Sequence, residues 1–389
     1  MNPNPLIAIP AFNRPDALAR LLRSVSNSRI TGDRPRVLIS IEGEAPHETV
    51  EVAESFRDRT IQFEVEIVMR SRRLGLREHI LNLGDLSRDH GSVLLLEDDL
   101  TIDPYAYEFA KANMSAYRDD SDIAGHALYA PRFNEFAWLP FEALENGYDT
   151  YFMQVPCSWG QLWTANQWIR FREWLGRDDL PDLREDVRLP RSLRRWPDSS
   201  WKKHFAHFMA SEDLWFTYPY RSFSTNHGEG GSHLKSKVHH FQTPMPLPDR
   251  TVRGWSLCPS EDRSVAYDAF MEPCGTAISL NRDDLTDDVT VDAYGIKPPE
   301  YLQKFSWVIT SKAVRHAEAV FPVSMRPIEH SILQPSEPKA GSPNLYLVRS
   351  ALLNDEGASL SKEWLRYWLG SFVISRRLVS RFLKAFWGR

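Results

Sequence analysis

The sequence predicts an α/β protein built on a mainly parallel sheet that is flanked by helices. Short apolar runs alternate with segments whose apolar residues recur at helical spacing, and polar residues collect directly after the apolar runs. Parallel strands are joined by right-handed crossover helices, so this alternation places helices on both faces of the sheet. The chain has 389 residues, more than one core usually holds, so we expect a large domain followed by an accessory region.

The predicted elements follow one another closely along the first hundred residues. The apolar run at residues 6–9 predicts a strand, and DALARLLRSV predicts the helix after it. RVLISIEGE predicts a second strand, and HETVEVAESFRD predicts a helix with an acidic first turn. FEVEIVMR, LREHILNLGDL and VLLL predict a third strand, its helix and a fourth, fully buried strand. Ligands of such sheets bind beyond the carboxyl ends of the strands.

Charged residues stand at the predicted carboxyl ends. Three consecutive acids follow the fourth strand, and like charges so close together disfavour ionisation unless a cation is near. Arginines at these ends suit a phosphate, as the acids suit a metal. Capping of the next helix is the plain alternative for the acids, but Asp103 before Pro104 is better placed for it. The residues at these ends are Arg14, Glu42, the arginines of residues 70–77, and Glu97, Asp98 and Asp99.

These motifs carry a resemblance to a known family. LLLEDDL, behind the N-terminal PLIAIPAFNRPDALARLLRSV, resembles the nucleotide-sugar-dependent glycosyltransferases of the GT-A fold, with a Rossmann-like sheet. The sequence is similar to N-acetylglucosaminyltransferase-type enzymes and to bacterial capsule and exopolysaccharide transferases over about residues 5–242. The resemblance implies a DxD-type motif that binds Mn²⁺ or Mg²⁺ on the donor's diphosphate. It assigns the metal to Asp99, with Glu97 and Asp98 supporting it or touching ribose and sugar.

The resemblance also implies a catalytic base and a pocket further along the chain. The acidic pair in ASEDLWFTYPYR maps Asp213 onto the base and makes Glu212 its neighbour; capping of a helix by Ser211 is the alternative. PCSWGQLWTANQW offers Trp159 and Gly160 for the sugar and acceptor pocket. Trp163 and Trp168 in the same segment are expected to be buried.

Further donor contacts are expected from a glycine-rich segment and from three charged residues. STNHGEGGSHLKSKVHHF makes His233 a candidate contact to the metal or diphosphate, and a flexible loop is the alternative. Arg14 and Glu42 are candidates for nucleotide contacts, although each could be a surface charge. Arg77 begins a helix, where a cation opposes the helix dipole and so indicates a phosphate partner.

We expect the large domain to span residues 1–243, the accessory region residues 244–345 and a helical tail residues 346–389. Residues 361–389 place apolar residues at helical spacing between basic ones. The apolar run between charges is far shorter than the ~20 residues that cross a bilayer. It therefore predicts an amphipathic helix on a membrane surface, and docking onto the protein's own core or a second subunit is the alternative.

Composition restricts the partners and the compartment. A net charge of -5, from 47 basic and 52 acidic residues, gives no global reason to bind nucleic acid. The three cysteines form no CxxC pair, so they support neither a disulfide framework nor a thiolate zinc site. The N-terminus lacks the pattern of a signal peptide. We expect a cytoplasmic protein, peripheral at the inner face of the membrane.

These features favour a metal-dependent glycosyltransferase, and the resemblance implies that it inverts the transferred carbon. It would move a sugar from a nucleoside-diphosphate donor, a UDP-sugar by expectation, to a hydroxyl of a glycan acceptor, which a lipid could carry. A nucleotidyltransferase is one alternative, but PAFNRP after the first strand lacks the glycines of its phosphate loop. A non-catalytic carbohydrate-binding protein is the other, and it would explain the aromatic residues but not the acids beside arginines.

Overall fold

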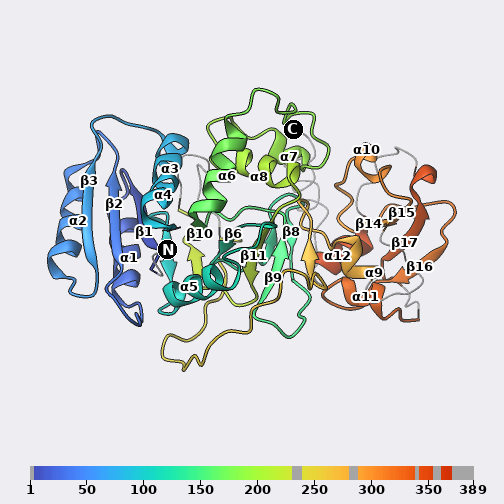
Figure 1. The fold of residues 1–389 in the computed structure, drawn as a ribbon. Helices are drawn as coiled ribbons and strands as arrows, with labels where there is room; N and C mark the ends of the chain where they lie inside the picture. Colours follow the sequence, from blue (N-terminus) through green and yellow to red (C-terminus); the bar gives the residue numbers. More distant parts are fainter. Residues whose placement is uncertain (1–3, 230–238, 280–287, 338–340, 354–360, 370–389) are drawn as a thin grey trace.

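The computed structural model describes residues 4–229, 239–279, 288–337, 341–353 and 361–369. A large α/β domain with a nine-stranded sheet lies beside a smaller module with a four-stranded sheet (Figure 1). The nine described strands of the large sheet are ordered β13-β9-β11-β6-β10-β4-β1-β2-β3. The predicted α/β fold with a mainly parallel sheet is confirmed.

The first half of the domain is a regular alternation of strands and helices. Strands β1 to β4 pair in parallel, and each helix connects one strand to the next. The elements are β1 (Leu6–Ala11), α1 (Pro15–Ser26), β2 (Arg36–Ile41), α2 (His47–Arg59), β3 (Glu64–Met69), α3 (Leu76–Asp85), α4 (Ser87–His90) and β4 (Ser92–Leu95).

The second half is less regular and mixes strand directions. β10 is antiparallel to both β4 and β6, whereas β11 is parallel to β6. The elements are β5 (Leu100–Ile102), α5 (Ala106–Ala116), β6 (Ile123–Ala127), β7 (Phe133–Asn134), β8 (Leu139–Pro140), β9 (Thr150–Met153), β10 (Gln161–Thr164), α6 (Ala165–Leu175), α7 (Arg191–Arg194), α8 (Trp201–Ser211), β11 (Trp215–Pro219), β12 (Ser224–Asn226) and β13 (Ala266–Tyr267).

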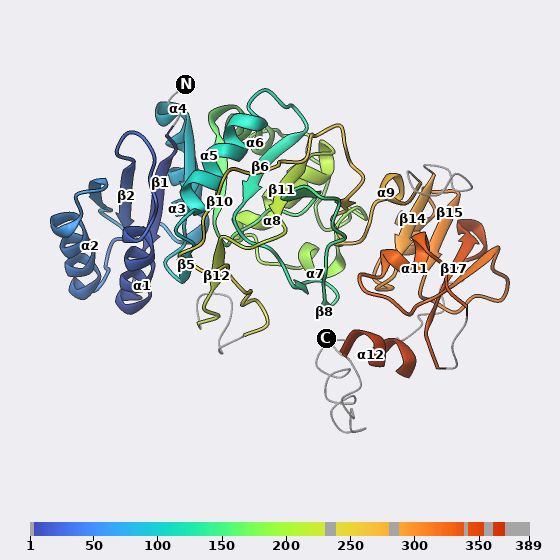
Figure 2. The ribbon, with the colours of Figure 1, turned by 90° about the horizontal axis from the view of Figure 1, so that it is seen from below.

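Helices α6 and α8 lie side by side on one face of the large sheet (Figure 1 and Figure 2), and aromatic side chains pack between them. Trp163 and Trp168 are fully buried, as expected, with ring centroids 4.6 Å apart. The ring centroids of Phe205 in α8 and Phe171 in α6 are 4.5 Å apart. Gly84 of α3 lets that helix approach, because a Cβ there would lie 2.1 Å from the Trp168 ring. Close packing of this kind makes the layer rigid.

The C-terminal module has its own small sheet and core. Its strands are ordered β14-β15-β17-β16, and its apolar residues form a separate buried cluster. The elements are α9 (Gly275–Ser279), β14 (Val289–Asp292), α10 (Pro299–Leu302), β15 (Trp307–Thr310), β16 (Ala319–Pro322), α11 (Glu329–Leu333), β17 (Asn344–Arg349), η1 (Ser350–Leu352) and α12 (Lys362–Leu369).

The predicted borders do not follow the sheets. β13 pairs with β9 in the large sheet, so the chain stays with the large domain well beyond residue 243. β17 pairs with β15 and β16 and crosses the predicted border at residue 346. β13 is only two residues long, and β17 is an interior strand of the small sheet. Local composition reveals neither pairing, and this is why both predicted borders differ from the structure.

The described part of the tail packs on the protein. Trp364 and Trp368 of α12 are buried, and the Trp368 ring stacks on Tyr294 at 4.7 Å. Residues 362–369 therefore dock onto the protein's own core, which was the alternative to the predicted membrane surface. These two rings do not face a membrane. The rest of the predicted amphipathic helix, residues 370–389, lies outside the described residues. No helix among the described residues is long and apolar enough to span a membrane.

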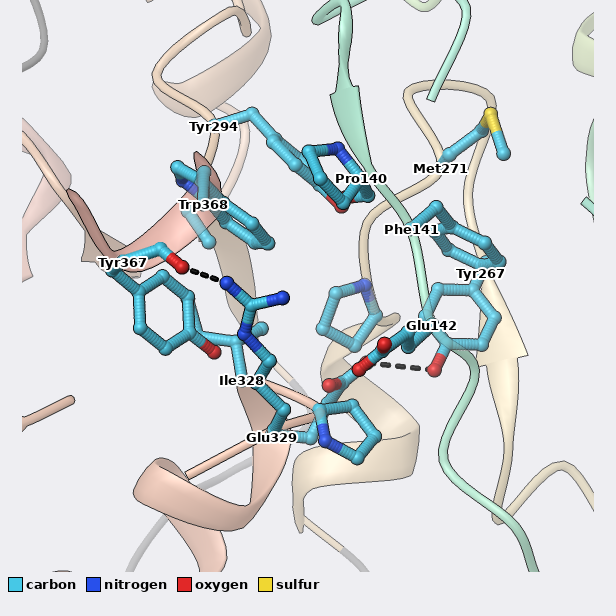
Figure 3. A pocket seen from close by; sticks show the side chains of 14 residues that line it. Pro140, Phe141, Glu142, Tyr267, Met271, Tyr294, Ile328, Glu329, Tyr367 and Trp368 are labelled. Atoms are coloured by element: carbon cyan, nitrogen blue, oxygen red, sulfur yellow. Dashed lines mark hydrogen bonds between the residues drawn. The ribbon is translucent and has the colours of Figure 1, made fainter. Parts of the chain in front are cut away.

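Large domain and module meet around a small pocket (Figure 3). Phe141 and Tyr267 line it from the large domain, and Ile328 and Trp368 from the module. The Tyr267 hydroxyl donates a hydrogen bond of 2.7 Å to Oε1 of Glu329, which is buried in α11. This contact couples the ionisation of Glu329 to the packing of the two parts.

Candidate active site

The acid triplet lies at the carboxyl end of β4, in the middle of the sheet. Asp98 is buried, and Glu97 and Asp99 are half-buried. Burial, reinforced by Asp99 and Asp98, raises the pKa of Glu97 to about 8. Burial also raises the pKa of Asp98 to about 6, against the attraction of Arg14. The triplet is thus a site where carboxylates are held together at an electrostatic cost.

Arg14, which follows β1, supplies the cation that the triplet requires. Its Nε donates to Asp98 Oδ2 at 3.2 Å, and its Nη1 donates to Asp99 Oδ2 at 3.1 Å. Its Nη2 also contacts Asp98 Oδ1. Because β1 and β4 are neighbouring parallel strands, their carboxyl ends meet at one edge of the sheet. Arg14 therefore lies against the acids, and its contacts fix their orientation.

One oxygen of Asp99 has no hydrogen-bond partner in the described part of the chain. This oxygen, Oδ1, is buried. Among the described residues, no group of three or more His, Cys, Asp or Glu side chains could hold a metal ion. A Mg²⁺ or Mn²⁺ ion that takes one or two carboxylates from the protein, and the rest of its ligands from substrate phosphates and water, suits this arrangement.

The start of the glycine-rich segment reaches the triplet. β12 pairs antiparallel with β5, opposing Asn226 to Leu100, so His227 comes beside Asp99. The backbone N–H of His227 donates to the Asp99 carbonyl at 3.1 Å, and its Nε2 lies 2.8 Å from the Thr101 hydroxyl. His233, predicted to contact the metal or diphosphate, lies outside the described residues.

Trp159 and Gly160 lie at the same edge as the triplet. Gly160 precedes β10, and its carbonyl accepts from the backbone N–H of Leu128 at 2.9 Å, just past the carboxyl end of β6. Gly160 has φ of 88°, a conformation that favours glycine. The half-buried Trp159 ring packs edge-on against Tyr129 at 4.7 Å. The structure thus brings both residues toward the predicted pocket.

Lys202 is a site residue that the sequence did not indicate. Its ammonium lies 5.4 Å from the centroid of the Trp159 ring and 5.5 Å from that of Trp196. It also lies 2.6 Å from Oε1 of Glu135 and is close enough to Glu97 to oppose the rise of that carboxyl's pKa. Lys202 stands in the first turn of α8, and lysines are mostly exposed, so nothing in the sequence indicated a role for it in the site.

Glu42 has a structural role in the loop before α3. Its carboxylate is buried and accepts from the backbone N–H groups of Leu74 at 2.6 Å and Gly75 at 3.0 Å. The His79 ring lies 3.3 Å from the same carboxylate. These contacts account for the burial of Glu42, and its predicted donor contact stays a prediction.

Arg77 is placed at the start of α3, as predicted. Its Nε is buried without a hydrogen-bond partner, and its charge helps to lower the pKa of His204 in α8, after burial as the main cause. Arg77 therefore points toward the beginning of α8, the same helix turn that carries Lys202.

Glu212 and Asp213 are not brought to the triplet. β11 runs in the same direction as β6 and β4, and Trp215 at its start is level with Ile123 at the start of β6. Asp213 precedes β11 and so lies at the opposite edge of the sheet, where its Oδ1 accepts from Gln154. Glu212 ends α8 and contacts Arg177 at 3.4 Å. The predicted base is wrong because these acids precede a strand instead of following one.

The mainly parallel sheet and the acids at the end of β4 agree with the GT-A fold that the sequence predicts. Residues 6–173 match the model of the family described as glycosyl transferase family 2. The match covers the triplet, Arg14, Trp159 and Gly160, and it confirms the predicted resemblance.

Similar folds occur among solved structures, with low sequence identity. S. aureus TarS 1-349 in complex with UDP-GlcNAc is 10% identical at a TM-score of 0.39, with 60% of this chain and 61% of that chain covered. GalNAc-T7 with UDP, GalNAc and Mn2+ is 11% identical at 0.39, with 56% and 42% covered. Mannosyltransferase PcManGT from Pyrobaculum calidifontis, in complex with GDP-Man and Mn2+, is 12% identical at 0.32, with 45% and 48% covered. The chain thus covers less than two thirds of each structure's length. No curated protein matches the sequence.

Proposed function

We propose that the protein is a metal-dependent glycosyltransferase that moves a sugar from a nucleoside-diphosphate donor to a hydroxyl of a glycan acceptor. The observation that carries this proposal is the unpartnered, buried Oδ1 of Asp99 beside the Arg14 guanidinium, within a glycosyl transferase family 2 domain. Asp99 would hold Mn²⁺ or Mg²⁺, and the metal would neutralise the charge that develops on the departing diphosphate. We expect a UDP-sugar as donor and inversion at the transferred carbon.

The acceptor side requires a carboxylate that takes the proton of the attacking hydroxyl. We assign this role to Asp198, which precedes α8 and is exposed. A hydrogen bond from Lys203, followed by that residue's charge, lowers the pKa of Asp198, so the carboxylate is ionised but is a weaker base than an unpaired one. Asp198 is two residues from Trp196, whose ring is linked through Lys202 to Trp159. This assignment replaces Asp213.

The experiment is a screen of nucleotide sugars for Mn²⁺-dependent hydrolysis by the full chain. The Asp99→Asn variant should lose about 100-fold or more in rate, because it removes the negative charge that would hold the metal ion. The exposed Asp89→Asn variant is the matched control and should keep the wild-type rate. The proposal is wrong if no nucleotide sugar is hydrolysed, if EDTA has no effect, or if both variants lose the same activity. Release of pyrophosphate from a nucleoside triphosphate would instead identify a nucleotidyltransferase.

A further inference from the structure

A basic hollow opens beside the segment that leads into α8. It has a volume of about 560 Å³ and is lined by four arginines and one lysine, but by a single acid. We call it the arginine hollow, and its lining residues are Arg184, Arg191, Arg194, Arg195, Trp196, Pro197, Asp198 and Lys203. Five cations in one concave surface are unusual in a protein whose net charge is -5. Such a concentration of one charge attracts an anionic ligand.

The single acid cannot neutralise this surface. Asp198 pairs with Lys203 at 2.8 Å and lies 3.8 Å from Arg184. Among the described residues, the guanidinium groups of Arg191, Arg194 and Arg195 take part in no ion pair.

Arg194 also carries a buried donor that finds no acceptor among the residues that the structure describes. This donor is its Nε, whereas its Nη1 donates to the Arg184 carbonyl at 3.1 Å. An unsatisfied buried donor costs free energy that a bound oxyanion would recover. Guanidinium groups hold phosphate oxygens through paired hydrogen bonds, so the hollow suits a phosphate more than a neutral sugar.

The hollow is connected to the triplet's edge of the sheet through intermediate side chains. Trp196 lines the hollow and also faces the ammonium of Lys202 at 5.5 Å. The same ammonium faces Trp159, which lies at the edge of the sheet that carries the triplet. Asp198, the proposed base, stands within the hollow's lining. A ligand in the hollow would therefore reach the side of the site where the acceptor hydroxyl must lie.

We propose that the arginine hollow binds a phosphate group carried by the acceptor, so that the acceptor is a phosphorylated saccharide. This inference rests on the proposed glycosyltransferase function and specifies its substrate class. The phosphate would sit on Arg191, Arg194 and Arg195, and the sugar attached to it would present its hydroxyl toward Asp198. The donor's diphosphate belongs to the triplet, so the two phosphate sites are separate.

The test measures binding of glucose 1-phosphate to the full chain by calorimetry, without nucleotide sugar. Methyl glucoside and glucuronic acid serve as the neutral and carboxylate probes. The variant Arg191→Gln/Arg195→Gln removes two exposed arginines of the hollow, and Arg88→Gln/Arg315→Gln removes two exposed arginines elsewhere. We expect glucose 1-phosphate to bind in preference to both other probes, and its Kd to rise about tenfold or more in the first variant only. Binding should also weaken as salt is added.

Several results would overturn the proposal. They are absence of glucose 1-phosphate binding, equal binding of methyl glucoside, tighter binding of glucuronic acid, or equal losses in the two double variants. The hollow would be a nucleic-acid site instead if single-stranded RNA bound more tightly than glucose 1-phosphate and the variant Arg191→Gln/Arg195→Gln lost that binding. Thermal stabilisation by UDP with Mn²⁺ in the first variant shows that the fold and the donor site persist. Hydrolysis of nucleotide sugars is measured in a separate experiment. Its absence would refute the glycosyltransferase proposal, whereas absence of glucose 1-phosphate binding alone would refute the phosphate site in the arginine hollow.

Discussion

Replacing Lys297 with methionine tests whether a buried charge cluster joins the large domain to the module. Lys297 follows β14 of the module and is buried, with its Nζ 2.5 Å from Asp268 Oδ2 and 3.6 Å from Glu272 Oε2. Both acids follow β13 of the large domain and are buried as well. Burial raises the pKa of Glu272 well above its usual range, and the nearby ammonium opposes this rise. The three groups are therefore stable only as a set.

The expected cost follows from what the substitution leaves behind. Methionine fills a similar volume, so the loss comes from two buried carboxylates without their cation, and breaking such a cluster costs about 3–5 kcal/mol. Urea unfolding monitored by circular dichroism measures it, if the m-value stays constant. The variant Lys297→Met/Asp268→Asn/Glu272→Gln removes all three charges and keeps the oxygens that accept from backbone N–H groups, such as Tyr294 N–H to Glu272. It should recover most of the stability.

Two outcomes would refute this reasoning. A loss below about 1 kcal/mol in Lys297→Met would show that the carboxylates are solvated or protonated at no cost. A triple variant as unstable as the single one would show that packing around the lysine stem decides the stability, and not charge.

Two further predictions concern packing and pH. Glu329→Gln should be more stable than the wild type at about pH 8 but not at about pH 5, by roughly 2 kcal/mol. Burial raises the pKa of Glu329 to about 7 in the folded protein, above its pKa in the unfolded chain. The wild type therefore keeps its full stability below the unfolded-state pKa and loses stability as the pH rises through the folded-state pKa, where the buried carboxyl ionises. Thermal unfolding at both pH values tests this, and a pH-independent difference would contradict it. Gly84→Ala should cost about 1–3 kcal/mol in urea unfolding, because its Cβ would overlap the Trp168 ring. Asn82→Ala in the same helix is the control, and an equal effect of both would exclude the overlap as cause.

The regular first half of the fold could be predicted from the sequence because each strand and helix has its own pattern of apolar residues. The apolar runs and helical spacings place β1 to β4 and their helices, and the acids at the end of β4 fall where parallel strands put ligands. α5 begins at Ala106, two residues after the predicted start at Pro104, with Asp103 accepting from the Tyr105 N–H at 2.8 Å. The N-cap residue is Tyr105, which makes no side-chain capping bond, so Asp103 stabilises the turn before the helix and the predicted cap is wrong.

The order and direction of the strands in the irregular second half could not be predicted, and Asp213 illustrates the physical reason. Its strand, β11, is short and fully buried, so its sequence has no alternation and gives neither neighbours nor direction. Whether an acid lies at the site depends on whether it precedes or follows such a strand. The hollow was also invisible, because Arg184 and the arginines near α7 lie far apart from the triplet in sequence and meet it only through the packing of Lys202 and Trp196.

Arg14 explains how three acids persist at one edge of a sheet. A divalent ion and a guanidinium can both balance the carboxylates, but only the guanidinium is part of the chain, so it is present before any donor binds. Its contacts occupy both oxygens of Asp98 and one oxygen of Asp99. The remaining oxygen of Asp99 is buried without a hydrogen-bond partner among the described residues, so it is available to an added cation. A divalent ion bound there would carry excess positive charge that a single carboxylate cannot balance, and a donor's diphosphate would supply the balance. Metal and donor should therefore bind this site together more tightly than either binds alone.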